Sequence, residues 1–233
     1  GGGGAGGGLR AADALGIDII QQCEVTGLDI QGNKIVGVNT SLADISCDRV
    51  GMAVAGHTSV LAKMAGFQVP ISSMALQAMV TEPMKPFIDV VVVSPLVHVY
   101  LHQSDHGEVV FGGGTDVGNS YAQRGSISVV EENVRALVEL FPCVSRLKLM
   151  RQWAGIVDIT PDTMPIIGKT PVDGLYLNGG WGTGGYKGIP AGGDTFAYTI
   201  ANDKPHPLVA RMSLARFRSG ELINEAASSG VAH

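Results

Sequence analysis

The spacing of apolar residues divides the first third of the chain into strand-like and helix-like segments. Residues 49–55 form a short apolar run, and a small-residue turn then leads into the helical pattern of residues 60–65. A buried strand that feeds a helix through such a turn is typical of α/β proteins. Upstream, the pattern predicts the end of a helix, two extended runs and a hairpin partner, at residues 9–15, 17–23, 24–30 and 34–39.

The middle of the chain shows the period of two that is typical of half-buried strands. Residues 74–81 alternate in this way, and residues 97–102 and 108–113 flank a polar turn as an antiparallel hairpin would. Residues 147–156 return as another strand. Between them, residues 127–141 have helical spacing, which places five apolar side chains on one face: Val130, Val134, Leu137, Val138 and Phe141. This part predicts an antiparallel sheet with one helix, an α+β arrangement.

The last third goes back to the α/β pattern. Residues 175–178 predict a strand, residues 179–190 a glycine-rich loop and residues 191–201 a helix, followed by a helical or irregular tail. An α/β segment that is interrupted by an α+β segment and then resumed indicates two interleaved domains.

Composition narrows the function classes. The chain has 233 residues, is 45% hydrophobic and carries a net charge of −5, which predicts a folded core and disfavours a nucleic-acid or anionic-membrane partner. Its longest apolar run, residues 90–93, is far shorter than the ~20 residues that span a bilayer, and no signal peptide opens it. Three scattered cysteines (Cys23, Cys47 and Cys143) favour a reducing, cytoplasmic location.

Seven of the 33 glycines lie in residues 1–8. This block formally satisfies GxGxxG, but the hydrophobic strand that a dinucleotide fingerprint requires does not precede it. We therefore treat residues 1–8 as a low-complexity block outside the fold.

The most informative stretch is residues 179–187, which holds five glycines between a predicted strand and a predicted helix. Unpaired N–H groups at a helix N-terminus suit an anionic or electron-rich group, such as a phosphate or a reduced flavin. Lys187 adds one full positive charge, which is suited to a substrate carboxylate. Two alternatives remain open: a purely structural turn, and a nicotinamide site through the GxGxxG of Gly180, Gly182 and Gly185, although no apolar strand precedes the acidic Asp203.

Other polar residues predict no further chemistry. His98, His102 and His106 lie in strand-like sequence, where a spacing of four spans ~13 Å, too far for one metal ion. We therefore predict no metal site. Three aspartates near turns (Asp158, Asp162 and Asp173) are expected to be solvated, and Trp153 is expected in the core.

Five stretches in the right order carry a resemblance to a known family. They are residues 10–27, 55–67 (AGHTSVLAKMAGF), 120–125, 159–168 (ITPDTMPIIG) and 173–190 (DGLYLNGGWGTGGYKGIP). The chain resembles the beta subunits of heterotetrameric sarcosine oxidases, within the D-amino-acid-oxidase-like flavin enzymes. The resemblance implies a partial FAD-binding Rossmann-like domain, residues 9–68 and 158–205, interleaved with an antiparallel-sheet substrate domain, residues 69–157, and followed by a tail, residues 206–233.

The resemblance also implies the site residues. Val25 would lie near the adenine, Ala55 and Gly56 beside the cofactor, and residues 182–185 (Gly182, Thr183, Gly184 and Gly185) with Lys187 in the flavin loop. Lys187 would also act in catalysis by binding the substrate carboxylate. Because no cysteine lies near Gly155, where related enzymes attach the flavin, FAD would be held non-covalently. The family's N-terminal module and the histidine that links a second flavin, FMN, are missing, so we expect an N-terminally truncated chain.

The implied activity is oxidation of a secondary amino acid, most specifically sarcosine, to glycine and formaldehyde. Electrons would pass to FMN and then to oxygen, which gives peroxide, in a complex with the other sarcosine oxidase subunits. The alternatives are a cofactor-free, non-catalytic fragment and a nicotinamide-binding oxidoreductase. For the chain as given, we expect weak or absent FAD binding.

Overall fold

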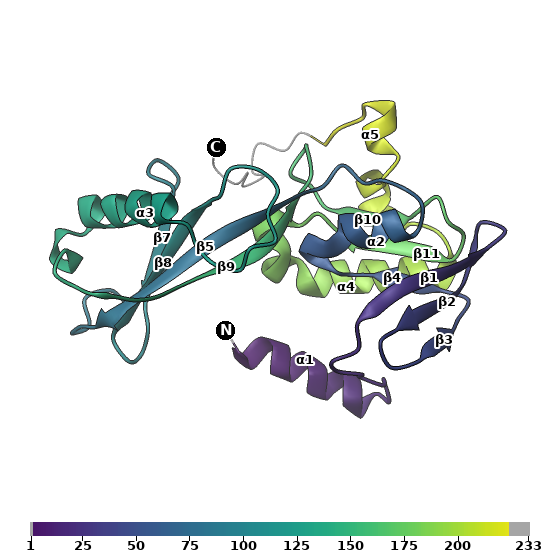
Figure 1. Ribbon diagram of the computed structural model, residues 1–233, viewed down its shortest axis with the longest axis horizontal. Helices are drawn as coiled ribbons and strands as arrows, with labels where there is room; N and C mark the ends of the chain where they lie inside the picture. The colour runs from purple at the N-terminus through teal and green to yellow at the C-terminus, as the bar shows by residue number, and fades with distance from the viewer. Residues whose placement is uncertain (1, 224–233) are drawn as a thin grey trace.

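The computed structural model describes residues 2–223, and its strands form three sheets (Figure 1). The first sheet has the order β1-β2-β3, the second β10-β11-β4, and the third β6-β7-β8-β5-β9. The strands are β1 (Val25–Gln31), β2 (Lys34–Thr40), β3 (Asp44–Ser46), β4 (Val50–Met52), β5 (Ser72–Pro83), β6 (Val92–Ser94), β7 (Val99–Gln103), β8 (Glu108–Thr115), β9 (Leu149–Ile159), β10 (Ile166–Lys169) and β11 (Leu175–Gly179).

Five α-helices accompany these sheets in the described part of the chain: α1 (Gly2–Ala14), α2 (Thr58–Met64), α3 (Ile127–Leu140), α4 (Gly185–Asn202) and α5 (Arg216–Ser219). Figure 1 shows α3 on the five-stranded sheet at one end of the elongated molecule, and α2 and α4 with the second sheet at the other. Within residues 2–223, no helix combines the length and apolarity that crossing a membrane requires.

The second sheet joins the two α/β segments of the chain. β4 pairs in parallel with β11, with Val50 opposite Leu175, while β10 pairs antiparallel with β11. The whole five-stranded sheet is inserted between β4 and β10 in the sequence. The predicted fold, an α/β part interleaved with an antiparallel sheet, is therefore confirmed.

Both faces of the second sheet are covered, as its nearly continuous apolar sequence requires. On one face, Leu175 and Leu177 pack with Met52, Ile35 of β2 and Ala65 after α2. On the other face, Ile167 and Tyr176 pack against Phe196 of α4 and against Val209. The carboxyl end of this sheet is therefore fixed between two helices.

The five-stranded sheet has one covered face and one open face. Met79, Leu101 and Phe111 pack beneath Ala136 and Leu137 of α3. Trp153 pairs with Ala78 on the opposite face and is 40% exposed, so the expectation that Trp153 lies in the core is wrong.

The predicted apolar face of α3 is only partly right. Leu137 is buried, and Val130, Val138 and Phe141 pack at the margin of the core, but Val134 is exposed. The buried positions include Val129, Ala136 and the polar Asn133, whose side-chain amide donates to the carbonyls of Gly113 and Val129. The spacing of apolar residues alone could not identify the buried face, because one of its positions is the hydrogen-bonded Asn133.

Three other predicted segments differ from the structure. Residues 17–23 form no strand, because Ile17, Ile19 and Ile20 have no sheet to pack on and remain exposed. The helix expected at residues 9–15 begins at Gly2, so residues 2–8 of the glycine block are helical and not outside the fold. The predicted loop at residues 179–190 ends early, because α4 begins at Gly185 and contains Pro190. The short strands β3, β6 and β10 were not predicted.

A buried ion pair fastens α5 to the loop between β9 and β10. The Arg216 Nε and Nη2 atoms donate to the Asp162 carboxylate at 2.7 and 2.9 Å, and both side chains are at most 3% exposed. Burial alone would raise the pKa of Asp162, but the hydrogen bonds from Arg216 and from the Ile223 amide outweigh it and lower this pKa to about 2. Asp162 is thus no solvated turn residue, contrary to expectation.

We expect Arg216→Met to reduce the free energy of unfolding by about 3–5 kcal/mol at pH 7, because it leaves the Asp162 charge buried without a partner. Urea denaturation measures this loss. Lys169→Met, which removes the exposed Lys169–Asp203 pair (2.9 Å), is the control and should change stability by less than about 1 kcal/mol.

The same pair predicts an acid transition. The pKa of Asp162 is lower in the folded chain than its ordinary value of 3.8, so its stabilisation is present above pH 4 and is lost as the pH falls toward 2. Urea midpoints measured between pH 2 and pH 7 should fall less steeply in the Arg216→Met variant. Parallel pH profiles in both proteins would contradict this assignment.

Candidate active site

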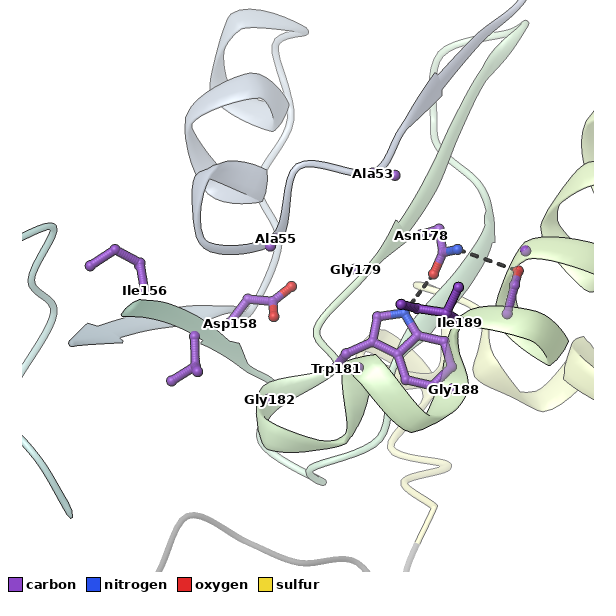
Figure 2. Close-up of a pocket in the computed structure, with 14 residues that line it drawn as sticks. Ala53, Ala55, Ile156, Asp158, Asn178, Gly179, Trp181, Gly182, Gly188 and Ile189 are labelled. Carbon is purple, nitrogen blue, oxygen red and sulfur yellow. Dashed lines mark hydrogen bonds between the residues drawn. The ribbon is translucent and has the colours of Figure 1, made fainter. Parts of the chain in front are cut away.

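The pocket most relevant to function lies where the parallel strands β4 and β11 end. In open α/β sheets, ligands bind in the crevice beyond the carboxyl ends of such strands. Here a pocket of about 340 Å³ opens between the segment after β4, the end of β9, and the turn that leads from β11 into α4 (Figure 2). Its lining residues are Ala53, Ala55, Ile156, Val157, Asp158, Asn178, Gly179, Trp181, Gly182, Gly185, Gly188, Ile189, Gly192 and Gly193.

The turn from β11 into α4 needs glycine at two positions. Gly180 and Gly182 have φ values of +75° and +52°, in the left-handed region that side chains disfavour. A single turn of 3₁₀ helix (Gly182–Gly184) follows, and α4 starts at Gly185. The N-cap residue of α4 is Gly184, which has no side chain, so the first N–H groups of α4 have no side-chain cap. The amides of Gly180, Trp181 and Gly182 just before it bind the Asp158 carboxylate instead.

The glycines around this turn have two different roles. A β-carbon at Gly188 or Gly192 would come within 2.3 or 2.7 Å of the Trp181 ring, so these two glycines make room for the indole. A β-carbon at Gly184 or Gly193 would meet nothing within 4 Å, and one at Gly182 nothing closer than 3.9 Å. Of the second group, Gly182 and Gly193 line the pocket, where they leave open space beside the backbone.

Trp181 forms a fixed wall of the pocket. Its Nε1 donates to Asn178 Oδ1 at 2.6 Å, and Asn178 Nδ2 donates to the Gly192 carbonyl at 3.4 Å (Figure 2). An isolated bridge also links Trp181 to Ile159 at the end of β9. Trp181 therefore connects the second sheet and α4 through its indole, and the five-stranded sheet through its backbone.

Asp158 brings a carboxylate into this otherwise mostly apolar pocket. Its side chain is 3% exposed, and Oδ2 accepts the Gly180 N–H. Burial raises the pKa of Asp158, while hydrogen bonds from the amides of Gly180, Gly182 and Trp181 oppose the shift without cancelling it. The expectation of a solvated turn residue is wrong here too, because the turn folds over the carboxylate.

The opposite wall is the short helix Ala55–His57 after β4. The carbonyls of Ala55 and Gly56 accept hydrogen bonds of 2.6 Å from Thr58 Oγ1 and Ser73 Oγ. A β-carbon at Gly56 would come within 2.3 Å of Ile156 Cγ2. Gly56 therefore allows the end of β9 to approach the α/β part closely.

The structure brings some of the predicted site residues together. Ala55, Gly182 and Gly185 line the pocket. Gly56 lies buried under Ile156, and Thr183 and Gly184 belong to the adjoining 3₁₀ turn without lining the pocket. Lys187 lies in the first turn of α4 with an exposed side chain, and it is not a lining residue.

Val25 is not brought to this pocket, because it begins β1 in a different sheet. Its assignment to the adenine end of the cofactor stays a prediction. Sequence reasoning missed Asp158, Asn178 and Trp181 as wall residues. The one sequence signal was an aspartate two residues after the predicted strand of residues 147–156.

Two alternative kinds of site, a metal site and a nicotinamide site, find no support in the described residues. Within residues 2–223, no group of three His, Cys, Asp or Glu side chains is arranged to hold a metal ion. Nor does a strand follow α4 in that part of the chain, as the nicotinamide alternative requires.

We expect Gly188→Ala to destabilise the chain by about 1–3 kcal/mol, because its methyl group must displace the Trp181 ring. Thermal unfolding and near-ultraviolet circular dichroism measure the two effects. The matched control is Gly193→Ala on the same helix, where space is open and alanine should stabilise by up to about 1 kcal/mol. Equal melting temperatures for the two variants would contradict the packing role of Gly188.

Comparisons with known proteins agree with this geometry. The chain is 55% identical to sarcosine oxidase subunit beta of Rhodobacter capsulatus and 51% identical to that of an Arthrobacter species. Both alignments cover 96% of the present chain. It spans 54% and 55% of these relatives, about half of their length.

Solved structures show the same fold. L-proline dehydrogenase from P. horikoshii matches with a TM-score of 0.85 and 29% identity, over 92% of this chain and 59% of the other. Glycine oxidase from Geobacillus kaustophilus matches with a TM-score of 0.77 and 18% identity, over 88% and 55%. Residues 7–199 match the family described as FAD dependent oxidoreductase, and the chain belongs to that family.

Proposed function

We propose that this chain forms part of an FAD-dependent amine oxidase that converts sarcosine to glycine and formaldehyde as one subunit of a larger complex. Three relatives named sarcosine oxidase subunit beta, 47–55% identical to the chain, support this substrate and assembly. Because the chain spans about half of each relative, the activity of the whole protein remains a proposal.

The observation that carries the proposal is the open glycine turn at the start of α4. The uncapped first N–H groups of α4 and the positive end of its dipole lie at a pocket with apolar walls, Ala55 and Ile156 among them. Such donors favour negative charge on an electron-rich ring. FAD bound there supplies the acceptor for the two electrons that leave the substrate.

Lys187 is proposed to bind the substrate carboxylate. It lies two residues after Gly185 and one residue before Gly188, both on the pocket wall, and its exposed ammonium group has no ion-pair partner in the described part of the chain. An ammonium–carboxylate contact would fix the orientation of the N-methyl carbon, and orientation of this kind lowers reaction barriers.

The proposed reaction balances without a further protein group. Sarcosine loses a hydride from its N-methyl carbon and a proton from its nitrogen, and water hydrolyses the resulting imine to glycine and formaldehyde. Oxygen takes up the two electrons and two protons as hydrogen peroxide. In this proposal Lys187 takes no part in the bond changes and acts only by binding the carboxylate.

Two further assignments belong to the proposal. A second flavin, FMN, would carry electrons from FAD to oxygen, which is supported only by the resemblance to the heterotetrameric enzymes. A cytoplasmic location is supported by Cys23, Cys47 and Cys143, which are free cysteines.

For the protein in its natural length, we expect Lys187→Met to lower kcat/KM for sarcosine about 30-fold or more, mainly through KM, because the carboxylate loses its charged partner. Steady-state peroxide formation measures this effect. Lys204→Met, two residues beyond the C-terminal end of α4, is the matched control and should leave kcat/KM unchanged. An unchanged KM in Lys187→Met would exclude the carboxylate role.

In the protein of natural length, we also expect the flavin at this site to be FAD held non-covalently. None of the three cysteines lines the pocket. Heat precipitation of the yellow protein should therefore release FAD into the supernatant, where chromatography identifies it. A colourless preparation that does not take up added FAD would favour the cofactor-free alternative, and colourless protein that binds NADH the nicotinamide one.

A further inference from the structure

Asp158 stands apart from the other buried carboxylate of the chain. Asp162 is paired with Arg216, whereas no described cation lies within salt-bridge distance of Asp158. A buried carboxylate without a counter-ion is costly, so a fold that keeps one needs a reason. The side chain also lines the pocket and points into the space between Ala55 and Gly182 (Figure 2).

Apart from the amide of Asp158 itself, the partners of this carboxylate belong to the proposed cofactor turn. Its carboxylate accepts the N–H of Gly180, and the amides of Trp181 and Gly182 also stabilise its charge. These three residues include both left-handed glycines of the turn. One side chain at the end of β9 therefore binds the backbone that leads from β11 into α4.

We propose that Asp158 is a positioning residue for the flavin: its carboxylate holds the amides of residues 180–182 in place and sets a negative charge beside the cofactor site. The inference rests on the proposed function and goes beyond it, because it assigns a role to a residue outside the glycine loop. The charge disfavours electron uptake by the neighbouring ring and so keeps the flavin potential low.

No charged side chain on the surrounding elements shifts the pKa of Asp158. The elements around the pocket carry titratable residues near it. They include His57 on the short helix after β4, Lys63 on α2, and Tyr186 and Lys187 on α4. None of them contributes to the shifted pKa of Asp158, which burial and backbone amides account for. No described cation is thus paired with this carboxylate.

The test compares Asp158→Asn with Asp173→Asn, an exposed carboxylate outside the pocket, in the protein of natural length at pH 8. Three quantities are measured: the melting temperature without flavin, the dissociation constant for added FAD, and the midpoint potential of bound FAD. Asparagine keeps the size of the side chain and removes its charge. We expect Asp158→Asn to weaken FAD binding about tenfold and to make the potential more positive, while Asp173→Asn matches the wild type.

Each outcome decides the proposal. If Asp158→Asn binds FAD with an unchanged or more negative potential, the proposal is overturned. The positioning role is supported if Asp158→Asn no longer binds FAD while its flavin-free form has the same melting temperature as flavin-free Asp173→Asn. A flavin-free Asp158→Asn protein that is already unfolded would show a role in folding only and would also overturn the proposal. Wild-type protein that binds no FAD would reject the proposed function itself, before any variant is compared.

Discussion

The parallel pairing of β4 with β11 brings together two segments that are far apart in the sequence, and the pocket depends on that pairing. Three residue pairs, from Val50–Leu175 to Met52–Leu177, align the ends of both strands at the same edge of the sheet. The short helix after β4 and the glycine turn after β11 then face each other across the crevice. The inserted five-stranded sheet closes the third side, because β9 ends at Asp158 and Ile159 against that turn.

Two carboxylates four residues apart show how burial is resolved in opposite ways. Asp162 meets a bidentate guanidinium, and its pKa falls to about 2, so its charge is fixed and ties the C-terminal part to the fold. Asp158 meets only backbone amides, and its pKa stays above the ordinary value. The first arrangement stabilises structure, whereas the second keeps a charge beside a pocket at an energetic cost. Such a cost is expected mainly at functional sites.

The sequence allowed the interleaved fold to be predicted, because the change from helical to alternating apolar spacing and back marks the insertion. Predictions from the sequence were wrong where tertiary contacts determine whether a segment forms a strand or a side chain is buried. Residues 17–23 have strand-like isoleucines but no neighbouring strand, and Asn133 replaces an apolar residue inside the α3 core. At the site, Ala55, Gly182 and Gly185 could be placed from local pattern. The burial of Asp158 and the packing of Trp181 on Gly188 could not, because both depend on how α4 approaches β9 and β11.

The composition of α4 explains why its first turns need outside support. Gly185, Gly188, Gly192 and Gly193 each reduce helix stability by about 1 kcal/mol relative to alanine, and Pro190 removes a backbone donor. Local propensity therefore works against a helix at this end. Trp181 on Gly188 and Gly192, together with Phe196 on the second sheet, supplies packing that compensates. Gly193 does not contact the indole, so packing on Trp181 does not explain a glycine at this position. Access of a ligand to the backbone does explain it, because Gly193 lines the pocket. The low helix propensity of α4 is thereby linked to the proposed function.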